Sequence, residues 1–182
     1  MKATFAIATL AGLVFSASAL AVTPTSYDTK FNVSANVPDS TYISDGDGNP
    51  VTEVDVVLEA VSSGFMEAKT DTLFMRSNDK AANVTMTLDD SVQGKNEPFK
   101  LWSSDNGLQE MSYKITANAG GSAAGALYAA SGDVHDFTLA NDAGKSYSQS
   151  PVIFHFVSDE KSVNLAQGNY KGVVYANVAA KP

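Results

Sequence analysis

The residues best placed for metal chemistry lie in one polar turn of the chain. Asp45, Asp47 and Asn49 alternate, which is how the first three ligands of a twelve-residue calcium loop are spaced. The sixth position of such a loop needs glycine for its sharp turn, and here it is Pro50. The twelfth position needs a bidentate glutamate, and here it is Val56. The segment is therefore interpreted as a hairpin-type turn, and no metal site is expected.

No set of residues in the sequence has the spacing of a catalytic site. Cysteine is absent, which excludes thiol nucleophiles and thiolate metal ligands. His135 lies beside Asp133 and Asp136, and His155 lies in an apolar run, but neither has a third partner at a metal-binding spacing. No Gly-x-Ser-x-Gly elbow presents a serine nucleophile. We therefore expect no enzyme, no catalytic residues and no cofactor.

The first 21 residues have the pattern of a secretory signal peptide. Lys2 gives a positive start, an uncharged apolar run follows, and Ala19-Leu20-Ala21 is a small-residue cleavage site. The apolar run is too short to cross a bilayer, which needs about 20 residues. Cleavage is expected between Ala21 and Val22, so the protein is predicted to be exported.

Composition and charge exclude further function classes. The formal net charge is −8, from 20 acidic and 12 basic residues. An acidic chain is a poor partner for nucleic acid and for anionic membrane surfaces, because both attract basic proteins. Behind the leader, the length is typical of one domain. Without disulfides, that domain must be held together by its core and by its assembly partners.

An alternating segment lies directly behind the leader. Phe31, Val33, Ala35 and Val37 point to one side and polar residues to the other, which is the period-2 pattern of a half-buried strand. Such a strand needs a groove in which to bury its apolar row, and no hairpin partner lies nearby. The groove can belong to its own domain or to another copy of the protein, and the residues alone leave both open.

The rest of the mature chain has the pattern of a β-sandwich. Short alternating runs are separated by turn-forming residues. The predicted strands lie at 54–60, 84–88, 99–102, 111–116, 153–157 and 170–178. Short strands with such turns are typical of an immunoglobulin-like sandwich, so the fold class is predicted to be all-β. Residues 117–150 have little periodicity and are predicted to form a long surface loop, with room for one short helix or strand.

Four stretches of the sequence occur in a characteristic order. They are the row ending at Val37-Pro38, Asp47-Gly48-Asn49-Pro50 ahead of Val54, Arg76-Ser77-Asn78-Asp79-Lys80 ahead of Val84, and Ala166-Gln167-Gly168-Asn169-Tyr170-Lys171-Gly172. With the leader, the length and the absence of cysteine, this set resembles the major pilins of the colonisation factor antigen I family. These are the alpha-type, or class 5, fimbriae of the alternate chaperone–usher pathway. The resemblance spans nearly the whole mature chain except about residues 120–150.

The resemblance implies an immunoglobulin-like domain that lacks its last strand. A periplasmic chaperone is then expected to fill the groove first, and the N-terminal extension of the next subunit to replace it after an outer-membrane usher is reached. The implied donor row is Phe31, Val33, Ala35 and Val37. The implied product is a helical homopolymer with a tip adhesin, a fimbrium on the bacterial surface that serves cell adhesion. The expected organisation is signal peptide 1–21, donor extension 22–38 and pilin domain 39–182.

The last predicted strand carries a second hypothesis from the same resemblance. In this family the C-terminal strand borders the groove and contacts the chaperone. The residues expected in this role are Tyr170, Gly172, Val174, Ala176 and Val178. The last four form one alternating row of small and apolar side chains, which we expect to face the core. A plain core strand is the alternative.

Two other function classes remain open. The first is a fimbrial tip or minor adhesin that binds host carbohydrate, with Trp102 and Lys100 as an imaginable sugar-stacking patch. Tip subunits of this family carry an additional lectin-like domain, which argues against it, and a tryptophan in a sandwich strand is more often part of the core. The second is an unrelated secreted β-sandwich, which would be a monomer that needs no chaperone.

Overall fold

The computed structural model describes residues 30–36, 40–79, 83–105, 109–120, 125–141 and 144–181. The chain divides after Asn36, so residues 30–36 are described apart from the domain that follows. The signal peptide, its cleavage between Ala21 and Val22, and the Val37 position of the alternating row lie outside the described residues. Among the described residues, no helix is long and apolar enough to span a membrane.

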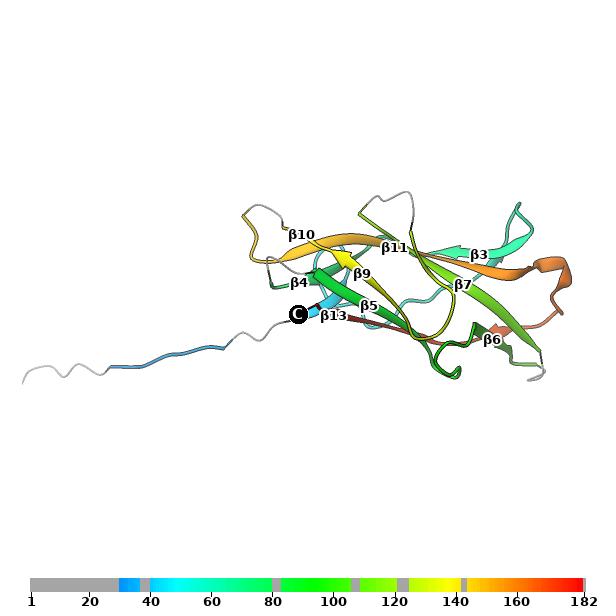
Figure 1. The fold of residues 1–182 in the computed structure, drawn as a ribbon, viewed down its shortest axis with the longest axis horizontal. Helices are drawn as coiled ribbons and strands as arrows, with labels where there is room; N and C mark the ends of the chain where they lie inside the picture. The colour runs from blue at the N-terminus through cyan, green and yellow to red at the C-terminus, as the bar shows by residue number, and fades with distance from the viewer. Residues whose placement is uncertain are drawn as a thin grey trace, which may run out of the picture. The chain divides into compact units, whose positions relative to one another are not determined.

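Most strands of the domain form one large antiparallel sheet (Figure 1). They are β1 (Thr41–Ser44), β2 (Glu59–Ala60), β3 (Phe65–Lys69), β4 (Leu73–Ser77), β6 (Phe99–Ser103), β7 (Glu110–Ala119), β8 (Ala126–Tyr128), β10 (Ala140–Asn141), β11 (Ser148–Lys161) and β12 (Tyr170–Lys171). The main order is β1–β4–β11–β7–β6–β12, with β3 and β10 also on β11, β2 on β3, and β8 on β7. The long strand β11 is central, because it pairs with β7 on one side and with β3 and β4 on the other.

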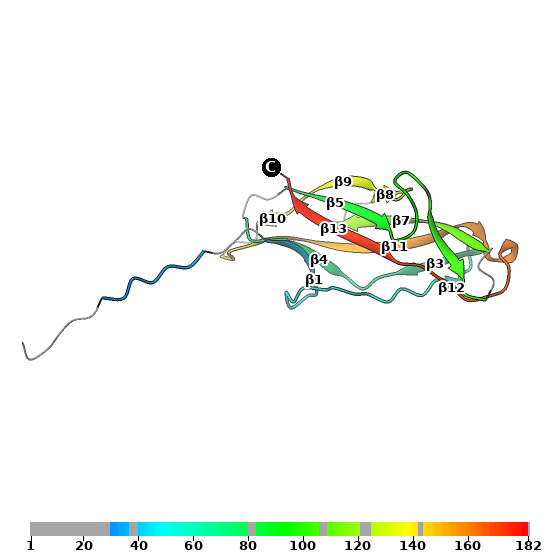
Figure 2. The ribbon, with the colours of Figure 1, turned by 90° about the horizontal axis from the view of Figure 1, so that it is seen from below.

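A second, smaller sheet packs against this one. It contains β5 (Asn83–Asp90), β9 (Asp133–Thr138) and β13 (Val174–Ala180) in the order β13–β5–β9. Figure 2 shows β13 and β5 side by side in front of the large sheet. The Tyr128 hydroxyl of β8 donates to the Met86 carbonyl of β5 at 3.1 Å and so joins the two layers. A single 3₁₀ turn, Ser162–Asn164, follows β11.

The hydrophobic core lies between the sheets and draws on both. Its members are Met75, Val84, Met86, Leu88, Phe99, Tyr113, Ile115, Ala117, Tyr128, Leu139, Val152 and Phe154. In β5 and β7 the buried residues alternate with more exposed ones, as expected for strands with one face on a core. Burial raises the pKa of Tyr113 and Tyr128 far above the usual value, with a smaller contribution from the charges of Asp90 and Asp133, so both phenols stay neutral.

One buried carboxylate organises the connection between β5 and β6. Asp90 is 7% exposed, and its Oδ1 accepts from the backbone N–H groups of Val92 and Gln93 at 2.8 and 3.1 Å. Its Oδ2 accepts from the Lys100 N–H at 3.0 Å. Replacing Asp90 with alanine is therefore expected to lower the free energy of unfolding by about 3 kcal/mol, because three donors lose a charged acceptor. Urea denaturation measures this, and an unchanged midpoint would contradict it; Asp89→Ala, at the exposed neighbouring position, is the matched control.

The β-sandwich predicted from the sequence is confirmed, and most predicted strands are present. Strands at 84–88, 99–102, 111–116 and 153–157 lie within β5, β6, β7 and β11. The last predicted strand is interrupted at Gly172 and Val173, so that β12 and β13 are separate.

Two sequence predictions are wrong. Residues 117–150 are not a long loop, because the end of β7, all of β8, β9 and β10, and the start of β11 occupy most of the part that is described. Residues 54–58 form no strand, and only Glu59–Ala60 of the predicted 54–60 strand pairs, with β3. The alternation is present, but among the residues described no neighbouring strand supplies its hydrogen bonds.

Candidate functional site

The end of the chain crosses from one sheet to the other. β12 pairs with β6 in the large sheet, and β13 pairs with β5 in the small sheet. Gly172 lies at the crossing, where an added Cβ would come within 2.9 Å of the Lys100 carbonyl oxygen and 2.8 Å of Leu101 Cδ2. Glycine is required here by close packing of backbone on backbone.

Replacing Gly172 with alanine is expected to lower the free energy of unfolding by about 1–3 kcal/mol, because the new methyl group overpacks a backbone contact. Gly94→Ala is the matched control, since its added Cβ would meet nothing closer than Glu97 Cγ at 4.0 Å. Thermal unfolding of both variants measures the difference. Equal melting temperatures would contradict the crossing described above.

Strand β13 turns one row of side chains toward the sandwich interior. The register pairs Val174 with Asp90, Ala176 with Leu88 and Val178 with Met86, which places these three β13 residues on the inward face. Val174 and Val178 are nevertheless only half-buried, and Ala176 is exposed. The interior is thus open beside β13, and the row that the sequence predicts to face the core is only partly covered by it.

The outer edge of β13 is unpaired. Within the described residues β13 bonds to β5 alone, so its second edge presents free backbone N–H and C=O groups. Tyr175, on the opposite face of the strand, is 63% exposed. An open edge with an uncovered apolar row can accept a further strand.

Strand β1, which lies close to β13, and residues 45–58 after it form the other border of this opening (Figure 2). The chain is held to the large sheet at both ends of the segment, through β1 on β4 and β2 on β3. Between them it leaves the sheet, apart from an isolated bridge between Ser44 and Pro50. Figure 2 shows this cyan segment along the lower border of the domain, with β13 above it. Val54 and Val57 are 44% and 73% exposed.

A hollow of about 880 Å³ opens over the inner face of the large sheet. One side is formed by Val56, Val57 and Leu58, and the other by residues 165–171, which lead into β13. Its remaining apolar lining is Met66, Leu101 and Met111. Other side chains that are only partly buried against the core include Ile43, Leu73, Phe156, Val174 and Val178. The opening therefore exposes apolar surface that a complete sandwich would cover.

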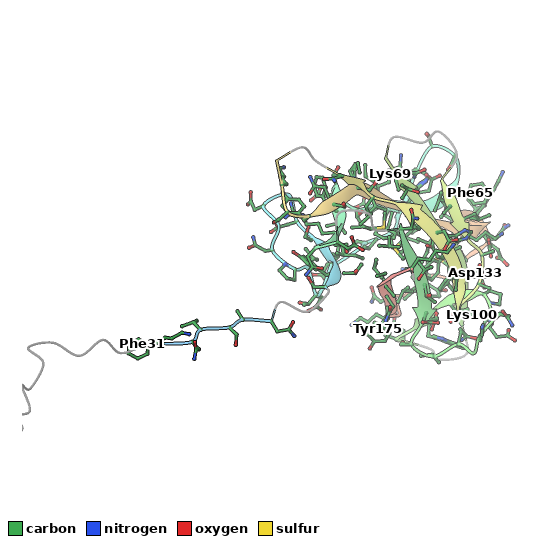
Figure 3. The ribbon with its side chains drawn as sticks, turned by 60° about the vertical axis from the view of Figure 1, so that its left-hand side comes forward. Phe31, Phe65, Lys69, Lys100, Asp133 and Tyr175 are labelled. Carbon is green, nitrogen blue, oxygen red and sulfur yellow. The ribbon has the colours of Figure 1, made fainter. Side chains whose placement is uncertain are left out.

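The alternating N-terminal segment is described by itself. Residues 30–36 form no strand and every side chain is exposed, with Phe31 and Val33 at 81% and 91% (Figure 3). Ala35 belongs to the same row, whereas Val37 lies outside the described residues. The segment offers an apolar row on a backbone that is not engaged in a strand.

The polar turn around Asp45 uses its carboxylate internally. Asp45 Oδ1 accepts from the Gly48 and Asn49 N–H groups at 2.7 and 2.9 Å, and Oδ2 accepts from Asn49 Nδ2 at 2.9 Å. These hydrogen bonds, led by the one to the Asn49 side chain, lower the pKa of Asp45. Among the described residues, no group of three potential ligands could hold a metal ion. The turn interpretation accounts for this segment.

The two histidines lie in different sheets and serve separate contacts. His135 Nε2 lies 2.9 Å from the Leu127 carbonyl oxygen, and its ring meets Tyr128 edge-on at 4.6 Å. His155 Nε2 lies 3.1 Å from Glu67 Oε2. The pKa of Glu67 is lowered, first by the Ser63 hydroxyl and then by His155. The histidines thus form no common site.

Trp102 is not a core residue, contrary to the more common arrangement. The register pairs Leu101 with the buried Met111 and Trp102 with Glu110, so Trp102 lies on the outer face of the large sheet. Lys100 Nζ lies 5.8 Å from the centre of the Trp102 ring and 2.8 Å from Glu110 Oε1. Strict alternation along β6 determines this, because Phe99 and Leu101 take the inward positions.

Comparison with known proteins shows the fold. No protein-family model and no curated protein matches the chain. The adhesive subunit CfaE of the CFA/I fimbria of enterotoxigenic Escherichia coli matches with a TM-score of 0.52 and 13% identity over 75% of this chain and 42% of that chain. A mutant of the same adhesin matches with a TM-score of 0.51 and 12% identity over 78% of this chain and 43% of that chain. The CooA pilin subunit from enterotoxigenic Escherichia coli gives a TM-score of 0.47 and 12% identity over 77% of this chain and 86% of that one.

The fold is therefore that of an all-β sandwich of the kind present in a fimbrial adhesive subunit. The chain spans less than half the length of that adhesin. An identity of 13% is a likeness of architecture, and function must be argued from the site.

Proposed function

We propose that this chain is a structural subunit of a surface fimbria and that it polymerises by donor-strand exchange. In this assembly, the alternating N-terminal segment of one copy lies in the opening of the next copy. The inserted row is Phe31, Val33, Ala35 and Val37, and the neighbouring β13 supplies backbone hydrogen bonds along its free edge. The fibre is a homopolymer in which this chain is the major subunit, and it serves cell adhesion.

The observation that carries the proposal is the open border between β13 and residues 45–58. An inward apolar row that is half-buried and a free strand edge lie there, and a hollow of about 880 Å³ opens beside residues 165–171, which lead into β13. An edge of this kind promotes uncontrolled association unless it is covered. The same chain carries an exposed alternating row of apolar side chains, which can cover the apolar lining of the opening.

Insertion of the row makes a large gross contribution to the interaction between subunits. Burying each phenylalanine or valine side chain contributes about 1.5–3 kcal/mol before entropy costs. Each new main-chain hydrogen bond contributes roughly 0.5–1.5 kcal/mol. The row therefore supplies on the order of 5–10 kcal/mol gross. A strand buried in this way also leaves slowly, which gives the polymer kinetic stability.

The proposal includes the partners that such a subunit requires. A periplasmic chaperone covers the opening before assembly and contacts the strand that carries Tyr170, Gly172, Val174, Ala176 and Val178. An outer-membrane usher exports the subunits, and a tip adhesin caps the fibre. The signal peptide with cleavage between Ala21 and Val22 starts this route, which ends in a fimbrium on the bacterial surface.

Electron microscopy of cells that express the chain with and without its cognate chaperone and usher tests the proposal. We expect thin surface fibres only when both are present, with a gel ladder that persists until the sample is boiled. A soluble monomer that needs no chaperone would overturn it. Immunogold labelling along the whole fibre supports the major subunit, whereas labelling confined to the tip would identify a tip or minor adhesin instead.

A further inference from the structure

The only arginine of the sequence is enclosed in the domain, and no acidic residue of the described part is its partner. Arg76 lies on β4 and is 9% exposed. Within the described residues its guanidinium makes no ion pair, and its Nε is buried without a hydrogen-bond partner. An enclosed charge is costly unless an opposite charge and hydrogen bonds compensate it. Within the described part of the domain, the charge of Arg76 therefore has no compensating anion.

The guanidinium is held in place by its surroundings. The Tyr147 ring centre lies 4.6 Å from Arg76 Cζ, which is a cation–π distance. At Gly48, an added Cβ would overlap Arg76 Nη1, so the backbone of that turn packs directly on the side chain. A planar guanidinium fixed in this way presents donors that match a carboxylate in two parallel hydrogen bonds.

The neighbouring side chains leave this donor set unused. Across the sheet, Arg76 pairs with Tyr42 on one side and with Gln149 on the other. Gln149 Oε1 is itself buried without a partner in the described residues. The carboxylate of Asp45, in the turn that covers Arg76, is occupied by its own turn hydrogen bonds. No acidic group of the described domain is in place to pair with Arg76.

The site lies where the domain continues into the N-terminal segment. Tyr42, the β1 partner of Arg76, is two residues from Ser40, whose N–H donates to Asn78 Oδ1 at 3.0 Å. The four steps of chain from Asn36 to Ser40 span at most about 15 Å. If residues 30–36 are inserted into a neighbouring copy, the surface of that copy must come within this distance of Ser40.

We propose that Arg76 is a carboxylate-binding site and that an aspartate or glutamate of the neighbouring copy, the one that accepts the N-terminal segment, fills it. The inference rests on the proposed function, because strand insertion is what brings the neighbour to this end of the domain. The chain has 20 acidic residues against 12 basic ones, so the surface of a second copy offers suitable side chains. The contact would fix the orientation of successive subunits, because a bidentate pair is directional.

Zero-length cross-linking of Arg76→Lys fibres tests the site. A carbodiimide joins lysine to a carboxylate in direct contact but leaves arginine unmodified, so wild-type fibres are the matched control. Fibres are assembled from equal amounts of ¹⁵N-labelled and unlabelled subunits. We expect mixed-isotope peptides that link position 76 to an aspartate or glutamate, and none in the chaperone-bound subunit. Fibres that give no such link, or only links within one chain, would overturn the site while leaving the proposed function intact.

A second measurement uses the unaltered protein, should Arg76→Lys fail to fold. Phenylglyoxal reacts with arginine, and Arg76 is its only side-chain target of this type. We expect modification to be at least about tenfold slower in fibres than in the chaperone-bound subunit, because an enclosed pair reacts only when the contact opens. Equal rates would overturn the site. Absence of wild-type fibres would overturn the proposed function, and with it this inference.

Discussion

Replacing Val33 with aspartate is expected to stop fibre formation while leaving the chaperone-bound subunit soluble. Val33 is 91% exposed in the described segment, so the change has little to disturb before assembly. In the proposed fibre it lies in an opening whose lining includes Leu101 and Met111. Lost valine burial and an unpaired carboxylate together cost at least about 3 kcal/mol, which lowers the binding constant by more than about 100-fold. Electron microscopy and the boiling-sensitive ladder measure the outcome.

Ser34→Asp is the matched control for this substitution. It adds the same charge one residue along the chain, but on the opposite side of the alternating segment. Normal fibres are expected from Ser34→Asp. Normal fibres from Val33→Asp would show that the donor row is assigned to the wrong residues. Loss of fibres in both variants would show that added charge, and not the apolar row, is responsible.

Alternation in the sequence located strands reliably where a core covers one face. In β7 the inward residues Met111, Tyr113 and Ile115 are apolar and the residues between them are polar, so sequence and structure agree. The same holds for Val84, Met86 and Leu88 in β5. When the opposite sheet buries one face of a strand, every second residue of that strand is apolar. Such a strand can therefore be predicted from its own residues.

Strand β9 shows where that pattern is lost. Its inward positions are Asp133, His135 and Phe137, opposite Leu88, Met86 and Val84. Asp133 Oδ2 accepts from two backbone N–H groups, at residues 129 and 130, and His135 bonds to a carbonyl oxygen of β8. Polar side chains can face inward here because nearby backbone satisfies them. Strand β9 therefore has no apolar alternation from which it could be predicted.

Residues 54–58 show the converse. Their alternation predicts a strand, yet a strand also needs a neighbour, and the described domain provides none at this place. A hydrophobic pattern records which face is to be buried, not whether the burying partner belongs to the same chain. The alternation of residues 54–58 without a strand partner is a local sign of the opening. It indicates an opening only in combination with the free edge of β13.

The remaining geometry of the opening depends on contacts between distant parts of the chain. Val56 and Leu58 line the same hollow as Leu165 and Tyr170, although more than 100 residues separate them. The alternating N-terminal row suggests that a groove exists, and the family resemblance implies that the C-terminal strand borders it, but the sequence does not identify the opposite border. That information lies in the sheet order, which is set by long-range pairing and not by propensity.

A chain that carries its own donor strand is expected to be a stable monomer. Residues 30–38 are appended after Pro182 through a short flexible linker, and the original copy of this segment is removed. The added strand then fills the opening within one molecule, at the high effective concentration that a short linker provides. A net gain of about 5 kcal/mol raises the melting temperature of a domain of this size by roughly 10–20 °C. Calorimetry and size-exclusion chromatography without chaperone measure both consequences.

The same fusion with Val33→Asp in the appended segment separates strand insertion from any general effect of a C-terminal extension. It has the same length and linker, but its row no longer matches the apolar opening. We expect this control to aggregate or to melt near the temperature of the chain that lacks the segment. Equal stability of the two fusions would mean that the opening does not accept the row. If the chain that lacks the segment altogether is already a stable monomer, the sandwich is complete without a donated strand. Residues 45–58 and the free edge of β13 would then require another partner.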